Sequence, residues 1–108
     1  FLHCGGGVLP FCEKDGEVLY LLHMVEEKSS KKYGMVVDFG GGYDKQDKSK
    51  YHTAAREWFE EICWYYGDKS NASEEIENLA KKLKELKHDI ATFGYFCCPL
   101  KIDYKPAN

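Results

Sequence analysis

The segment from Gly42 to Trp64 constrains the fold more than any other, because two kinds of side chain separate onto different faces of one helix. At about 100° per residue, Glu57, Glu60 and Glu61 fall within one arc of the helix. A second arc is apolar and wide enough to pack on a core; it holds Ala54, Ala55, Trp58, Phe59, Ile62 and Tyr65. The pattern predicts an amphipathic helix that seats on the core and turns three carboxylates outward.

The three carboxylates lie at helix positions i, i+3 and i+4, where like charges oppose one another by about 0.2–0.5 kcal/mol per pair. A divalent cation over this face would relieve the repulsion, since Mg²⁺ takes carboxylate oxygens, water and phosphate. A solvated Glu-rich surface is the alternative. The context favours a site: the glycines Gly40–Gly42 lie just upstream, and Arg56, the only arginine beside fourteen lysines, precedes the first carboxylate. Arginine's planar fork can orient a carboxylate.

These residues resemble the Nudix box, G-x5-E-x7-R-E-U-x-E-E-x-G-U, in which U is a bulky apolar residue. Counted from Gly42, the positions in register are Arg56, Glu57, Trp58, Glu60, Glu61 and Trp64. Seven of the nine specified positions match without a gap. Lys48 stands at the first Glu and Cys63 at the second Gly. The chain is therefore identified, by resemblance, as a Nudix hydrolase domain.

The resemblance implies a single α+β domain over residues 1–108, an α/β/α sandwich around a mixed sheet. It implies hydrolysis of a nucleoside diphosphate linked to another moiety, with Mg²⁺ or Mn²⁺ as cofactor. Glu57, Glu60, Glu61 and the backbone carbonyl of Gly41 would hold the metal. Glu60 could instead be the base that takes a proton from water, and Arg56 would orient Glu57.

The two departures from the box carry expectations of their own. Lys48 beside Arg56 would repel it where the family has attraction, which would lower activity. Cys63 in place of glycine is a milder change, because glycine there mainly permits a left-handed helix end. We expect the helix to run on to Tyr66, with Gly67 taking over that role.

Lysines are frequent in the two loops expected to rim the site: Lys28, Lys31, Lys32, Lys45, Lys48 and Lys50. They favour a polyanionic substrate, such as a diphosphoinositol polyphosphate, a dinucleoside polyphosphate or a capped RNA end, although lysine is common throughout this chain. Gly42, Lys45 and Lys48 are the expected substrate contacts. Two other functions stay open: a degenerate module that binds nucleotide or RNA without cleaving it, and a purely structural interaction domain.

Composition limits the class of protein. A chain of 108 residues with 44% hydrophobic residues is enough for one domain with a core. The net charge of −3 gives no general argument for nucleic-acid binding. No apolar run reaches the ~18 residues of a membrane span, so no membrane partner is expected. Five cysteines without a regular framework favour free thiols in a reducing cytoplasm.

The rest of the chain is expected to alternate strands and turns around the helix. Strands are predicted at Val8–Cys12, Tyr33–Phe39, Ile90–Cys98 and Leu100–Tyr104, with an Asp15–Gly16 hairpin turn. The apolar run Val18–Val25 is expected in the middle of a covered sheet. A second amphipathic helix is expected from Asn71 to about His88.

Nudix domains usually finish with a helix packed on the sheet, and the chain offers none before Asn108. We therefore expect a domain that is shortened, or completed by further residues or by another chain, with a homodimer among the outcomes. The apolar residues expected to seek cover are Phe93, Tyr95, Cys97, Leu100, Ile102 and Tyr104. Asp103 is the weak candidate for the family's fourth acidic ligand.

Overall fold

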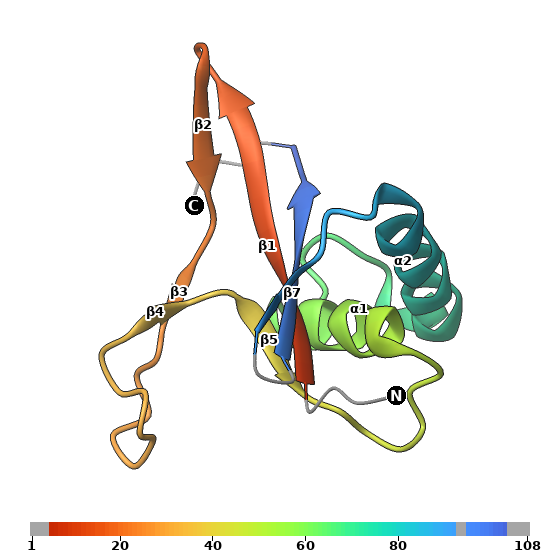
Figure 1. The fold of residues 1–108 in the computed structure, drawn as a ribbon, viewed down its shortest axis with the longest axis horizontal. Coiled ribbons are helices and arrows are strands. Elements are labelled where there is room, and N and C mark those ends of the chain that lie inside the picture. Colours follow the sequence, from red (N-terminus) through yellow and green to blue (C-terminus); the bar gives the residue numbers. More distant parts are fainter. Residues whose placement is uncertain (1–4, 93–94, 104–108) are drawn as a thin grey trace.

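The computed structural model describes residues 5–92 and 95–103, and in these ranges the chain is a small α+β fold (Figure 1). The strands are β1 (Gly5–Lys14), β2 (Glu17–Tyr20), β3 (His23–Met24), β4 (Val36–Val37), β5 (Phe39–Gly42), β6 (Ile90–Thr92) and β7 (Tyr95–Lys101). The helices are α1 (Lys50–Glu61) and α2 (Ala72–Leu86), with a short 3₁₀ turn, η1 (Lys69–Asn71), before α2. The expected Phe93 and Tyr104 positions lie outside the described residues.

The sheet is mixed, as expected, and β1 is its longest strand. One side of β1 pairs in parallel with β7, and β6 lies antiparallel beyond β7. The other side is shared between two antiparallel partners, β5 along Gly5–Val8 and β2 along Phe11–Lys14. Pro99 was expected to separate two strands, but it lies inside β7 and pairs with Leu9.

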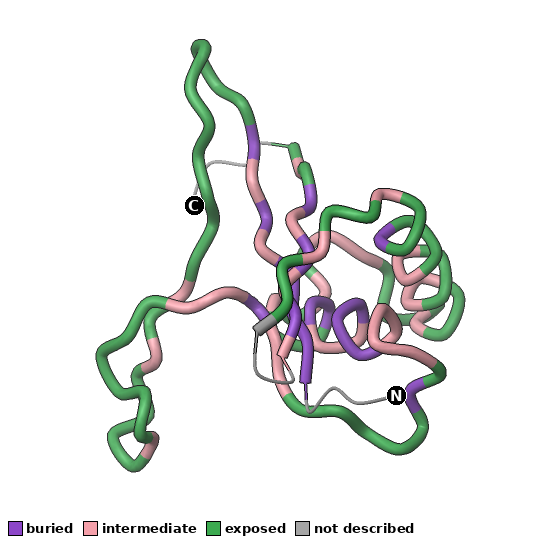
Figure 2. The backbone as a smooth tube through the Cα atoms, viewed as in Figure 1, coloured by how far each residue is buried: buried purple, intermediate pink, exposed green. Residues whose placement is uncertain are grey.

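The core lies between the sheet and α1, and α2 packs on α1 (Figure 2). Val8, Ala54 and Ala55 have no exposed surface, and Trp58 and Leu83 have 1%. Both helices lie on the same side of the sheet in Figure 1. Within the described ranges, no helix covers the other face, so the third layer of the expected sandwich is not seen there.

The run Val18–Val25 was expected to be covered, and this prediction is wrong. Within this run, three residues, Val18, Leu19 and Tyr20, belong to β2, and His23 and Met24 form β3. Tyr20 and Met24 are 59% and 58% exposed. The hairpin extends past the end of β7, whose last partner on β1 is Phe11. In the described sheet, β2 pairs with β1 alone. The Asp15–Gly16 turn is confirmed, with both residues at positive φ.

Helix α1 begins after Ser49, whose side chain accepts a hydrogen bond from the His52 amide at 3.1 Å. It ends at Glu61, five residues before the predicted Tyr66. Cys63 itself adopts the left-handed conformation, with φ 51°. Gly67 does not take that role; a Cβ there would lie 2.6 Å from Phe59 Cε1, so its lack of a side chain serves packing.

The second helix, α2, agrees closely with its predicted range and ends at Leu86, where Lys87 turns left-handed. In the described part of the chain, neither helix is both long and apolar enough to cross a membrane.

Candidate functional site

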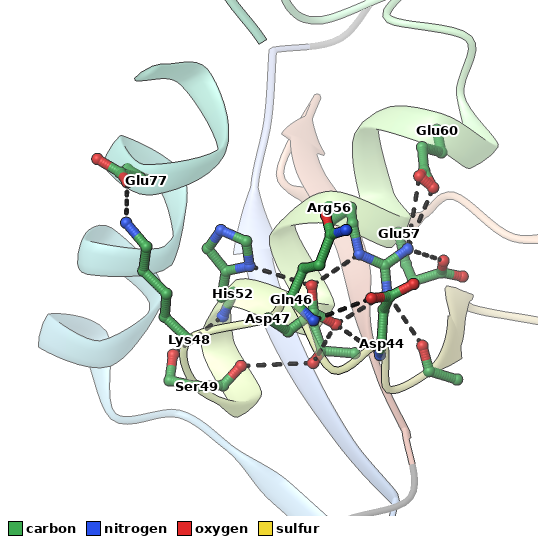
Figure 3. A network of polar contacts seen from close by, with 12 residues as sticks. Asp44, Gln46, Asp47, Lys48, Ser49, His52, Arg56, Glu57, Glu60 and Glu77 are labelled. Carbon is green, nitrogen blue, oxygen red and sulfur yellow. Dashed lines mark hydrogen bonds and ion pairs between the residues drawn. The ribbon is translucent and has the colours of Figure 1, made fainter. Parts of the chain in front are cut away.

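Asp47 lies at the centre of the polar network in Figure 3, in the loop that joins β5 to α1. Its side chain has no exposed surface. Arg56 donates from Nε to Oδ1 at 2.8 Å and from Nη2 to Oδ2 at 2.9 Å. The Thr53 hydroxyl and the Asp44 amide each donate to Oδ2 at 2.9 Å. Asp47 is therefore a buried acceptor that fixes the first turn of α1 and the loop before it.

The charge of Asp47 is strongly favoured in the folded protein. Burial alone would raise the pKa of its carboxyl group, because a charge loses water there. The hydrogen bonds from Arg56, Asp44 and Thr53, and the contact with His52, outweigh burial and hold this pKa well below its usual range. The same pair raises the pKa of Arg56. The lowered pKa of Asp47 and the raised pKa of Arg56 both favour the ionised forms of this pair at neutral pH.

Arg56 connects this buried carboxylate to two carboxylates of α1. Its Nη1 donates to Glu57 Oε1 at 2.7 Å and to Glu60 Oε1 at 3.1 Å. Its Nη2 also donates to the carbonyl oxygen of Gly42 at 3.0 Å. The structure thus brings Arg56, Glu57 and Glu60 together, as the sequence predicted, with the end of β5 beside them.

Lys48 does not lie beside Arg56, so the expected repulsion between them is wrong. The Lys48 ammonium forms an ion pair with Glu77 on α2, at the left of Figure 3 and away from Arg56. Asp47, one residue earlier, meets the arginine instead. The helical spacing fixes Arg56 relative to Glu57, but a loop has no fixed period, so an acidic residue one position away can reach the same place. The acidic residues of the Asp44–Lys48 loop were the available signal.

Glu57 packs against Gly41, which has no side chain in the way. A Cβ on Gly41 would lie 1.7 Å from Glu57 Oε2, so a side chain at this point would displace the Glu57 carboxylate. Burial raises the pKa of Glu57; Arg56 opposes this, and the charges of Glu60 and Glu61 add to it. Glu57 is therefore a partly buried carboxylate whose pKa is raised mainly by burial, although Arg56 contacts it.

The Gly41 carbonyl was expected to join the metal ligands, and this stays a prediction. Its oxygen lies 2.5 Å from where a Cβ of Gly5 would stand, so it faces β1 within the strand pair. The Gly42 carbonyl, the next along β5, turns the other way and accepts from Arg56. In this structure, the contribution of Gly41 is the space it leaves for Glu57.

Glu60 and Glu61 lie on the outer side of the same helix turn. The Glu60 side chain is 49% exposed, and Glu61 is also exposed. Exposed side chains change rotamer within nanoseconds, so both can turn toward Glu57. As the side chains stand, no three His, Cys, Asp or Glu residues of the described ranges are grouped closely enough to hold a metal ion.

The remaining expected site residues are more dispersed. Lys45 is exposed in the β5–α1 loop. The segment before Asp103 pairs with the far end of β1, because the Ile102 amide donates to the Phe11 carbonyl at 2.8 Å. Gly42, beside the arginine, pairs with Gly5 at the opposite end of β1. The structure therefore does not bring Asp103 to the carboxylate cluster.

No family model, no curated protein and no solved structure matches this chain.

Proposed function

We propose that this chain is a metal-dependent pyrophosphohydrolase of the Nudix type, acting on a nucleoside diphosphate linked to another moiety. The observation that carries the proposal is the position of Arg56, held by the buried Asp47 on one side and bonded to Glu57 and Glu60 on the other. A solvated Glu-rich helix face needs no buried partner for its arginine. A helix that presents carboxylates in a set orientation does need such a partner, because the arginine must itself be fixed in order to fix them.

The donor chemistry of the cluster fits Mg²⁺ or Mn²⁺, since all its side-chain donors are hard carboxylate oxygens. Glu57 and Glu61 would hold the ion, and Glu60 would be either a third ligand or the base that takes a proton from water. The negative charge around Glu57, which contributes to its raised pKa, is what a cation would neutralise. When bound, such an ion stabilises the negative charge that develops on the oxygens of a pyrophosphate.

The chain's own residues have separate roles in this proposal. Arg56 orients Glu57 through the 2.7 Å hydrogen bond to Oε1 and favours its ionised form against the effect of burial. Glu60 is exposed enough to meet a water molecule and accept its proton as that water attacks phosphorus. Gly41 allows the Glu57 carboxylate to approach the end of β5, where the Gly42 carbonyl turns toward Arg56.

One observation favours a second function, a module that binds a nucleotide or RNA without hydrolysing it. Arg56 Nη1 already occupies an oxygen of Glu57 and an oxygen of Glu60. If Arg56 stays hydrogen-bonded to both carboxylates, these are less available to a cation. The cluster would then bind a ligand without turnover.

A metal titration with a panel of pyrophosphates separates the two functions. A hydrolase should turn over one or more of a nucleoside diphosphate sugar, a dinucleoside polyphosphate, a diphosphoinositol polyphosphate and a capped RNA when Mg²⁺ or Mn²⁺ is added. The cation should also raise the thermal midpoint, and Glu61→Gln should remove most of that gain. Glu85→Gln, an exposed change on α2, is the matched control. Metal-independent ligand binding without turnover would select the second function.

A further inference from the structure

A pocket of about 350 Å³ lies on the face of the sheet opposite α1. It is lined by Gly5, Lys32, Val37, Asp38, Gly40, Gly41, Gly42 and Tyr95. Two consecutive glycines of β5 distinguish the two faces of the sheet. A Cβ on Gly41 would meet Glu57 of α1, whereas a Cβ on Gly40 would point to the opposite face and meet Tyr95. The volume is at the lower end of the ~300–1,000 Å³ of small-molecule sites and is sufficient for a purine ring.

The polar wall of this pocket, the Asp38 pocket, is formed by Asp38 and Tyr95. The Tyr95 hydroxyl donates to Asp38 Oδ2 at 3.0 Å. Burial, followed by the charge of Asp38, raises the pKa of Tyr95, so its hydroxyl stays a donor. The Cys97 thiol also faces Asp38, and its pKa is raised to about 12, by burial first. A carboxylate offers about four acceptor positions, so Asp38 can still accept from a ligand.

Glycines of β1 and β5 leave room for the side chains of Tyr95 and Asp38. A Cβ on Gly40 would lie 2.1 Å from Tyr95 Oη, and one on Gly7 would lie 2.8 Å from Asp38 Oδ2. Side chains at these positions would collide with Tyr95 and Asp38, so the two glycines allow these groups to lie against the sheet. The aromatic ring of Tyr95 and the apolar side chain of Val37 line the pocket, and such surfaces suit a planar ring.

The charges of the pocket favour a base over an inositol polyphosphate. Lys32 is the one cationic residue among those that line it, and Asp38 places a carboxylate against the ligand. Two lysines expected at the rim are engaged elsewhere, Lys48 with Glu77 and Lys50 with Asp89. A ring carrying several phosphates would be repelled by Asp38, whereas a neutral ring with N–H donors would be attracted.

The pocket and the carboxylate cluster share one strand. Gly40–Gly42 line the pocket on one face of β5, and Glu57 and Arg56 contact Gly41 and Gly42 from the helix side. β5 pairs with β1 alone, so its outer edge is free within the described sheet. A ligand whose ring lies in the pocket can pass around this edge and present a phosphate chain to Glu57.

We propose that the Asp38 pocket binds the base of a guanine nucleotide, with the two carboxylate oxygens of Asp38 accepting from the ring N1–H and the exocyclic amine. Guanine presents two adjacent N–H donors to a carboxylate. Adenine and cytosine present an amine beside a bare ring nitrogen, which a carboxylate repels. Lys32 contributes the positive charge for a phosphate. This assignment rests on the proposed function for the identity of the phosphate chain, although base binding can be tested without turnover.

Calorimetry with the whole chain and no metal tests the pocket directly. GDP should bind at least tenfold more tightly than IDP, which lacks the exocyclic amine, and than ADP. Asp38→Asn should lose this preference and bind XDP more tightly than GDP, because an amide can donate to the xanthine oxygen and accept from N1–H. If Asp38→Asn does not fold, the comparison of GDP with IDP and ADP on the wild-type protein decides alone.

Two further measurements keep this inference separate from the proposed function. Glu57→Gln should still bind GDP with the wild-type preference over IDP, because Glu57 lies on the other face of β5. A wild-type protein that prefers GDP but hydrolyses no pyrophosphate when Mg²⁺ or Mn²⁺ is added would overturn the hydrolase and leave the pocket standing. Equal affinities for GDP, IDP and ADP, or tighter binding of inositol hexakisphosphate in competition with GDP, would overturn the assignment of the pocket.

Discussion

Arg56 and Asp47 form a two-point ion pair in which Nε and Nη2 of the guanidinium reach the two carboxylate oxygens at 2.8 and 2.9 Å. Because two contacts fix the plane of a guanidinium, the third nitrogen, Nη1, has a set direction. It points at Glu57. The orientation of a half-exposed helix face is thereby set by a carboxylate in the preceding loop.

Removal of the charge of Asp47 should destabilise the fold. Asp47→Asn removes the negative charge that Arg56 faces and leaves one acceptor oxygen for the donors of Arg56, Thr53 and Asp44. Breaking a buried pair in this way typically costs about 3 kcal/mol. Urea unfolding monitored by circular dichroism measures it. Lys48→Ala, which removes only an exposed ion pair, is the control and should have a small effect; equal losses in the two variants would contradict a special role for Asp47.

Asp47 should also make the unfolding free energy depend on pH in the acidic range. The pKa of Asp47 is lowered in the folded state from an ordinary value of 3.8. The unfolded chain therefore binds the proton more readily, and the unfolding free energy should fall as the pH drops from about 5 through 3.8 and below. Urea unfolding across this range should show a steeper fall for the wild-type protein than for Asp47→Asn. Parallel curves would contradict the assignment. The raised pKa of Glu57 acts with the opposite sign.

Lys48→Glu restores the residue that the Nudix box has at this position, yet it should not raise turnover. In the structure, residue 48 faces Glu77 on α2, so a carboxylate there would repel Glu77 and would not reach Arg56. We expect unchanged turnover of the best substrate and a slightly lower thermal midpoint. An increase in turnover relative to Lys48→Ala would show that residue 48 can exchange places with Asp47.

Cys63→Gly should stabilise the protein. Cys63 holds a left-handed conformation, with φ 51°, at the end of α1, and this conformation costs a residue with a Cβ about 1 kcal/mol or more. The expected gain in unfolding free energy is about 1 kcal/mol. Cys63→Ala keeps the Cβ and should show no such gain. If both variants are equally stable, the strain at residue 63 is not significant.

The sequence predicted the helix periods well, because an amphipathic helix repeats its pattern every turn. The carboxylate face of α1, the range of α2 and the Asp15–Gly16 turn follow from local rules. The exposure of Tyr20 and Met24 does not, since an apolar run has the same composition whether or not another layer covers it. Helix length was overestimated past Glu61 because the apolar pattern continues through a left-handed turn.

The site was predictable to the extent that it lies on one helix. Arg56, Glu57, Glu60 and Glu61 have fixed spacing, and the structure places the first three in contact. The role of Asp47 depends on the path of a loop, and the meeting of Asp38 with Tyr95 depends on the pairing of strands 57 residues apart. Neither contact follows from a repeating pattern in the sequence, so neither could be predicted from it.

The most direct test of the proposed function is the Mg²⁺-dependent rate of pyrophosphate hydrolysis by Glu57→Gln, measured beside Glu85→Gln and the wild-type protein. A bound cation contributes several kcal/mol to such a reaction, which corresponds to about two orders of magnitude or more in rate. We predict that Glu57→Gln loses at least that much in kcat/KM while remaining folded, and that Glu85→Gln keeps wild-type turnover. A folded Glu57→Gln protein with wild-type turnover would contradict a catalytic role for this carboxylate cluster.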